Sequence, residues 1–130
     1  MYFNTKFKIL ICDDNADFRK AFKLQLNDVM WGWIECIDEA CTGEQAMYMV
    51  EQNRYHIAFM DIEMPGYNGI DTAHYINTNH PRLRIVALTM HSEREYMEKM
   101  IYAGARHYLI KDRLDDVSIT KIFRQVAKTI

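Results

Sequence analysis

Acidic, hydroxyl and ammonium side chains follow short apolar runs at four places in the sequence. Asp13 and Asp14 follow "FKILIC", Asp61 follows "HIAFM", Thr89 closes "RIVALT", and Lys111 follows "HYLI". Carboxylate oxygens with no convergent His or Cys suit a hard cation, of which Mg²⁺ is the best fit. A lysine ammonium and a threonine hydroxyl suit the oxygens of a phosphoryl group. A carboxylate such as Asp61 can be the nucleophile that forms an aspartyl phosphate.

The charges of these residues also favour a bound cation. Three aspartates against one lysine leave two uncompensated negative charges. Like charges about 4 Å apart repel by about 1 kcal/mol in water and by about 4 kcal/mol at an effective dielectric constant near 20. A divalent ion would bring the sum to zero, and the site could then accept an anionic phosphoryl group.

Taken singly, each of these residues has an ordinary structural explanation. An Asp-Asp pair often begins a helix, and here Asp14 or Asn15 could be the N-cap. A lone lysine is usually solvated, a threonine often closes a strand, and Pro65-Gly66 is a common turn. The prediction of a site therefore depends on whether the fold brings these positions together.

Hydrophobic periodicity supplies such a fold, because short apolar runs alternate with amphipathic helical patterns. Strands are predicted over residues 7–12, 33–37, 56–60, 84–89 and 107–110, and helices over 15–30, 43–53, about 69–79, from Ser92 to near Gly104, and from near Asp115 to Ile130. This alternation predicts an α/β fold, a doubly wound five-stranded parallel sheet with five helices, flavodoxin-like with strand order 2-1-3-4-5. Ligands of such sheets bind beyond the carboxyl ends of the strands.

Composition narrows the class of protein. The chain has 130 residues, which predicts one domain, and its net charge of −2, from 16 basic and 18 acidic residues, gives no footprint for direct nucleic-acid binding. Cys12, Cys36 and Cys41 form no metal-spaced pair, and their odd number argues against a disulfide framework, so we expect reduced thiols and a cytoplasmic protein. No apolar run predicts a membrane span or a signal peptide.

The sequence around these positions resembles a known family. Asp13-Asp14, "MDIEMPGYNGI" around Asp61, "ALTMH" with Thr89, and "AGARHYLIKD" with Lys111 resemble the receiver (response regulator) domain of bacterial two-component signalling. The resemblance covers essentially the whole chain, so residues 1–130 would form a single receiver domain. Residues 87–112 resemble the NarL/FixJ type, which commonly precedes a helix-turn-helix DNA-binding domain.

The resemblance implies a metal-dependent phosphoacceptor. Asp61 would take a phosphoryl group from a phosphohistidine on a sensor histidine kinase, or from a small donor such as acetyl phosphate. Mg²⁺ would be held by Asp14, Asp61 and the backbone carbonyl of Glu63, with Asp13 assisting through water. The domain would assist its own phosphorylation and dephosphorylation, as a signalling module and not as an enzyme that turns over a substrate.

The resemblance also implies a conformational switch. Thr89 and Lys111 would bind the phosphoryl oxygens, Thr89 would be drawn toward them, and Tyr108 would move inward behind it. The surface of the fourth helix, fifth strand and fifth helix would then change its affinity for partners, which could include a second copy of the chain. Glu63 and His91 occupy positions that tune dephosphorylation in this family.

Two other functions start from the same pattern. An Asp-nucleophile phosphohydrolase usually has a second Asp two residues after the nucleophile, where this chain has Glu63, and the chain has no inserted cap domain. A flavin-binding module of similar topology needs a phosphate loop after the first strand, and "CDDNAD" is acidic. We expect the chain to be either a stand-alone receiver or, as the NarL/FixJ resemblance favours, a fragment of a transcription factor.

Overall fold

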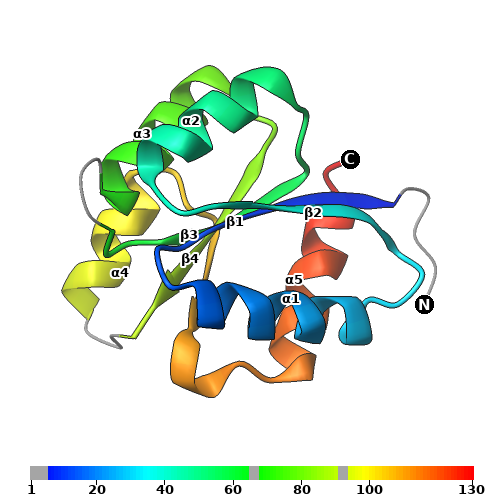
Figure 1. The fold of residues 1–130 in the computed structure, drawn as a ribbon. Helices are drawn as coiled ribbons and strands as arrows, with labels where there is room; N and C mark the ends of the chain where they lie inside the picture. The colour runs from blue at the N-terminus through cyan, green and yellow to red at the C-terminus, as the bar shows by residue number, and fades with distance from the viewer. Residues whose placement is uncertain (1–5, 65–67, 91–93) are drawn as a thin grey trace.

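The computed structural model describes residues 6–64, 68–90 and 94–130 and confirms the predicted architecture (Figure 1). Five parallel strands form one sheet in the order β2-β1-β3-β4-β5. The elements, in chain order, are β1 Phe7–Cys12, α1 Ala16–Val29, β2 Ile34–Ala40, α2 Gly43–Gln52, β3 Ile57–Asp61, α3 Gly69–Asn79, β4 Arg84–Thr89, α4 Arg94–Tyr102, β5 His107–Ile110, a short 3₁₀ helix η1 Lys111–Arg113, and α5 Asp116–Ala127. No helix among the described residues is both long and apolar enough to cross a membrane.

Two apolar layers sandwich the sheet. Figure 1 shows α1 and α5 on one face, and α2, α3 and α4 on the other. Successive residues of a strand point to opposite faces, so β1 sends Ile9 and Ile11 toward α1 and α5, and Leu10 and Cys12 toward the other layer. Because both faces of the sheet are covered, the central strands β1 and β3 are apolar at almost every position.

Strand register brings the polar residues to one edge. Cys12 pairs with Met60, Asp61 with Leu88, and Thr89 with Ile110. Asp13 therefore follows β1 beside the end of β3, and Lys111 follows β5 beside Thr89. Since β2 and β3 lie on opposite sides of β1, the order of the strands reverses at β1, which is where open α/β sheets bind ligands.

Polar caps begin four of the helices at or near this edge. The side chains of Asn15, Thr42, Asn68 and Asp115 each accept a hydrogen bond from a backbone N–H three residues later. Asn15, and not Asp14, caps α1, which settles the alternative left by the sequence. The predicted cap Ser92 and the turn Pro65-Gly66 lie outside the described residues.

The second strand is longer than the predicted span of residues 33–37. It begins at Ile34 and pairs with β1 as far as Ala40. Its polar residues tolerate the sheet edge because each has a partner: Asp38 accepts a hydrogen bond of 2.6 Å from the Tyr55 hydroxyl, and Glu39 forms an ion pair with Arg19. The short helix η1 was also not predicted.

Gly69 is required by the close approach of two chain segments. A Cβ at this position would lie 2.0 Å from the carbonyl oxygen of Asp61 and 2.6 Å from Cα of Ile62. Gly69→Ala must therefore move α3 or the end of β3, and we expect it to lower the free energy of unfolding by about 3 kcal/mol in urea titrations. Thr78→Ala, at an exposed position of the same helix, is the control and should change stability by less than about 0.5 kcal/mol. Equal stability of the two variants would contradict this account.

Candidate functional site

Three carboxylates meet at the carboxyl edge of the sheet. Asp13 and Asp14 follow β1, Asp61 ends β3, and each offers an oxygen within 4.8 Å of those of the other two. Asp13 is completely buried and Asp61 is 4% exposed, whereas Asp14 faces solvent. The structure thus brings together the three acids that the sequence singled out.

Lys111 is the counter-charge within this cluster. Its Nζ lies 2.5 Å from Asp13 Oδ2 and 3.3 Å from Asp61 Oδ2, and its side chain is only 13% exposed. Burial by itself lowers the pKa of Lys111, but the close contact with Asp13 and the charge of Asp61 outweigh burial and raise that pKa. Lys111 is therefore a permanent cation that holds two of the three carboxylates.

The pKa of the Asp61 carboxyl is raised toward neutral pH by its surroundings. Burial raises its pKa, and the charge of Asp13 adds to this, while a hydrogen bond from the Glu63 backbone N–H to Oδ1 (3.0 Å) and the charge of Lys111 oppose it. The balance raises the pKa of Asp61 to about 6 from an ordinary 3.8. Near neutral pH the carboxylate is ionised but poorly compensated, which favours binding of a further cation.

The donor set fits a magnesium ion. Asp13 Oδ2 is fully buried, and its nearest described partner is the Lys111 ammonium, 2.5 Å away. An oxygen-only set in which carboxylates of Asp13, Asp14 and Asp61 converge is the kind that Mg²⁺ occupies with several waters retained. The site therefore suits the metal that the sequence predicted.

The remaining predicted residues lie around the cluster at different depths. Thr89 ends β4 and is 2% exposed, whereas Tyr108, on the neighbouring β5, is 46% exposed. Glu63 is exposed, and its backbone N–H donates a hydrogen bond to Asp61 Oδ1. His91 lies outside the described residues.

Arg19 supports the turn that carries Asp13 and Asp14, a role that was not predicted from the sequence. Its Nη1 donates to the backbone carbonyl of Asp13 at 2.6 Å, and its Nε donates to Glu39 Oε1 at 3.1 Å. The Asn15 backbone N–H also donates to Asp13 Oδ1 at 2.8 Å. One weak signal existed: a helical residue one turn past the N-cap directs its side chain back toward the helix start.

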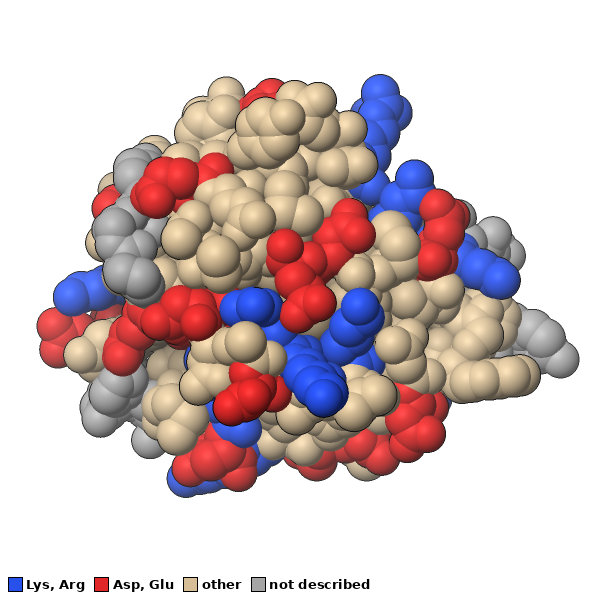
Figure 2. All heavy atoms as spheres, viewed as in Figure 1, with Lys and Arg blue, Asp and Glu red and all other residues tan. Residues whose placement is uncertain are grey.

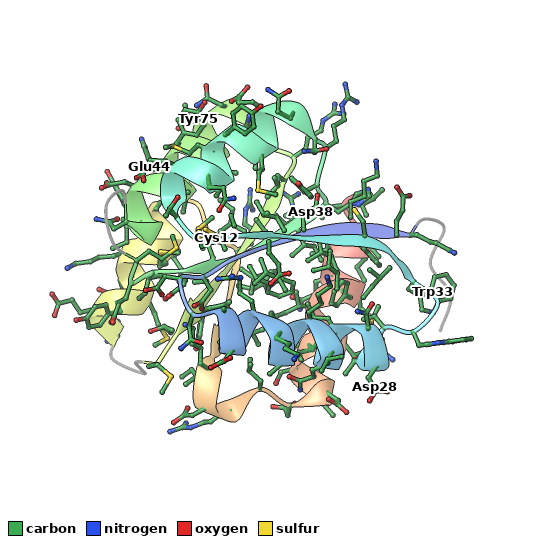
Figure 3. The ribbon with its side chains drawn as sticks, viewed as in Figure 1. Cys12, Asp28, Trp33, Asp38, Glu44 and Tyr75 are labelled. Carbon is green, nitrogen blue, oxygen red and sulfur yellow. The ribbon has the colours of Figure 1, made fainter. Side chains whose placement is uncertain are left out.

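Cys12 lies beneath the carboxylates on the other side of the sheet. Figure 3 places it at the end of β1 near α2, with Trp33 at the opposite end of the sheet. Its Sγ is 3.4 Å from the Thr42 carbonyl oxygen and 3.4 Å from Met64 Sδ. Burial, and then the charges of Asp61 and Asp13, raise the pKa of this thiol far above its ordinary value.

An open groove of about 1030 Å³ lies at the opposite edge of the sheet and contains none of the site residues. Its basic lining residues are Arg54, Arg82 and Arg84, with two histidines. The carboxyl ends of α2, α3 and α5 lie at this edge, and cations compensate the partial negative charge there. Figure 2 shows acidic and basic side chains interspersed over the visible face, without an extended patch of one sign.

The sequence is similar to those of bacterial regulatory proteins. It is 32% identical over 116 residues to the oxygen regulatory protein NreC of Staphylococcus carnosus. The aligned region covers 88% of this chain and 52% of that protein. It is 29% identical over 117 residues to the transcriptional regulatory protein DegU of Brevibacillus brevis, covering 90% and 49%. The chain spans about half the length of these curated relatives.

Solved structures share the fold. The signal receiver domain of the putative response regulator NarL from Mycobacterium tuberculosis has a TM-score of 0.84 at 24% identity, covering 95% of this chain and 98% of that one. The receiver domain of the sensor histidine kinase PA1611 from Pseudomonas aeruginosa, which has magnesium coordinated in its active-site cleft, has a TM-score of 0.82 at 23% identity and covers 95% and 99%.

A family model, the response regulator receiver domain, matches residues 9–123. That span includes β1 from Ile9 onward, the other four strands in full, and the complete carboxylate cluster. The order of the strands and the NreC and DegU relatives agree with this match. The chain therefore belongs to the response regulator receiver domain family, as the resemblance in its sequence predicted.

Proposed function

We propose that residues 1–130 form one receiver domain that works as a phosphorylation-dependent signalling switch, with Asp61 as the phosphoacceptor. The observation that supports this most directly is the position of Asp61. It ends a central strand of the sheet, almost buried, and is within reach of two further carboxylates and one ammonium. Such a site holds a nucleophile, room for a cation and a positive group for phosphoryl oxygens.

The proposed reaction transfers a phosphoryl group from a phosphohistidine of a sensor histidine kinase. An Asp61 oxygen forms a bond to phosphorus, the phosphorus–nitrogen bond breaks, and the imidazole leaving group takes a proton. Asp13, Asp14, Asp61 and the backbone carbonyl of Glu63 would hold Mg²⁺, which supplies charge neutralisation for the transferring group when it is bound. Asp61 must be ionised to attack, which its pKa of about 6 allows at neutral pH.

Other residues then bind or release the phosphoryl group. Lys111 pairs with a phosphoryl oxygen as a point charge, and the Thr89 hydroxyl donates to another. Water completes the cycle by hydrolysing the aspartyl phosphate, and the side chains of Glu63 and His91 tune that rate. The domain acts as a phosphoacceptor that assists both half-reactions and releases no other product.

The proposed output is a shift between two packings. Thr89 is buried and Tyr108 is half exposed, so movement of Thr89 toward the phosphoryl group would open space for Tyr108 to turn inward. The surface of α4, β5 and α5 would respond, and it already exposes several large apolar side chains, namely Ile101, Tyr102, Tyr108 and Val117. Such a surface suits a second copy of this chain or another protein partner.

The relatives suggest what this surface controls. DegU is named as a transcriptional regulatory protein and is about twice as long as this chain. We propose that the switch acts in the cytoplasm and regulates transcription through a DNA-binding domain outside these residues. The domain itself has no excess of basic residues for binding nucleic acid.

Phosphorylation should occur at Asp61 and nowhere else. Incubation with Mg²⁺ and acetyl phosphate should add one phosphoryl group to the intact mass, and Asp61→Asn should abolish it. Asp71→Asn, which makes the same change at an exposed site on α3, is the control and should leave the adduct in place. An adduct that survives Asp61→Asn, or no adduct with any donor, would falsify the assignment.

Asp61→Asn should also stabilise the metal-free protein. Because the pKa of Asp61 is raised in the folded state from 3.8 to about 6, the folded protein binds more protons between these values, and its stability falls as pH rises through that window. Removing the charge should therefore raise the free energy of unfolding by about 1–3 kcal/mol at pH 7.

The pH dependence separates this electrostatic effect from a change in packing. Urea titrations with a chelator should show the difference between wild type and Asp61→Asn fully above about pH 6, shrinking to nothing below about pH 4. Added Mg²⁺ should stabilise the wild type more than the variant. A difference that does not depend on pH would refute the charge argument.

A further inference from the structure

The ammonium of Lys111 has a third neighbour besides its two carboxylates. Nζ lies 4.6 Å from the centroid of the Phe18 ring and over its face, which is the geometry of a cation–π interaction. Figure 1 shows how this contact arises, since the turn after β5, in orange, lies beside the start of α1. With Asp13 and Asp61 on its other sides, Lys111 is left almost without solvent.

Phe18 is held in place through both its backbone and its ring. Its backbone N–H donates to the N-cap Asn15 at 3.0 Å. The ring stacks on Phe22, with centroids 5.5 Å apart and planes 25° apart, and Phe22 meets Phe59 edge-on at 5.0 Å. Phe59 lies in β3 two residues before Asp61, so the ring that faces Lys111 is oriented by the strand that carries the phosphoacceptor.

The partners of Lys111 differ in whether a metal competes for them. Asp13 and Asp61 belong to the carboxylate cluster that suits Mg²⁺, so a bound cation draws on the same two carboxylates that hold Lys111 in its absence. The face of an aromatic ring is a hydrocarbon surface and is no ligand for a hard cation. The lysine ammonium sits on a flexible four-carbon stem and would otherwise be free to leave.

We propose that Phe18 is a positioning residue for Lys111. Its ring face retains the ammonium at the site when the carboxylates are engaged elsewhere, so that Lys111 is in place for the incoming phosphoryl oxygens. The inference rests on the proposed function of Asp61 but concerns a residue to which that function assigns no role. It requires an aromatic face, and an aliphatic side chain of similar size would not replace it.

Fluorination of the ring tests the electrostatic part of this contact with little change in size. Phenylalanines with one, two and three ring fluorines would be incorporated at position 18. Each added fluorine makes the ring face less negative and so weakens its attraction for a cation. The rate of Asp61 phosphorylation by phosphoramidate at saturating Mg²⁺ should fall stepwise, by about 10-fold over the series. The Mg²⁺ concentration for half-maximal rate should change less than about 2-fold, because a ring is not a metal ligand.

The matched control is the same series at Phe123, a fully buried ring whose described ring neighbours are Phe7 and Phe59. That series should leave the phosphorylation rate within about 2-fold of wild type, because among the described residues the cation–π contact is at Phe18 and not at Phe123. A flat series at position 18, or an equal fall at position 123, would overturn the proposal. A parallel loss of Mg²⁺ affinity at position 18 would also overturn it, because that result indicates general loosening of the site.

A spectroscopic measurement decides the proposal without phosphorylation. The ε-methylene protons of Lys111 should show an upfield ring-current shift in NMR spectra, should lose it in Phe18→Leu, and should keep it in Phe18→Tyr. The shift should persist in the wild type when Mg²⁺ is added, and its disappearance on Mg²⁺ binding would refute retention by the ring. If wild-type Asp61 accepts no phosphoryl group, the proposed function fails, and the ring-current shift still decides whether Phe18 holds Lys111.

Discussion

Repulsion among Asp13, Asp14 and Asp61 is the constraint around which the carboxyl edge of this domain is built. Their oxygens lie within 4.8 Å of one another, and the described ion pairs at the cluster come from one ammonium, that of Lys111. A repulsion of about 1 kcal/mol per pair in water grows several-fold where solvent is excluded. The pKa of Asp61 is raised mainly by burial, and the charge of Asp13 adds to that effect. Repulsion among these carboxylates disfavours folding, so burial of the two apolar layers of the sheet must offset it.

The sheet can impose this arrangement because the register of its strands decides which residues reach the site. A slip of one residue would send Asp61 to the opposite face and Met60 into the site. The register is fixed by central strands buried on both sides and by the close approach of Gly69 to the end of β3. Arg19 then donates to the backbone carbonyl of Asp13, and the Asn15 backbone N–H donates to the Asp13 carboxylate, so both hold the turn after β1. The acids are thus placed by the whole fold and not by one another.

The parts of this fold that sequence patterns predicted are those governed by local periodicity. Strands β1, β4 and β5 and helix α3 begin and end where predicted, and parallel pairing places Asp13, Asp61, Thr89 and Lys111 at one edge. Contacts between distant segments were not predictable in this way. The end of β2 depends on Tyr55 and Arg19, and the ring beside Lys111 comes from the first turn of α1. Neither set of contacts produces a hydrophobic periodicity that could be recognised in the sequence.

The protonation state of Cys12 matters for the chemical stability of the proposed aspartyl phosphate. An aspartyl phosphate is an activated carboxyl group, and a neighbouring thiolate that attacked its carbonyl carbon would expel phosphate and leave a thioester. Only the thiolate is a competent nucleophile, and burial keeps Cys12 protonated beneath the site. Its sulfur is turned toward the Thr42 carbonyl and Met64. The acyl phosphate is thereby shielded from capture by its own protein, and its decay is left to water.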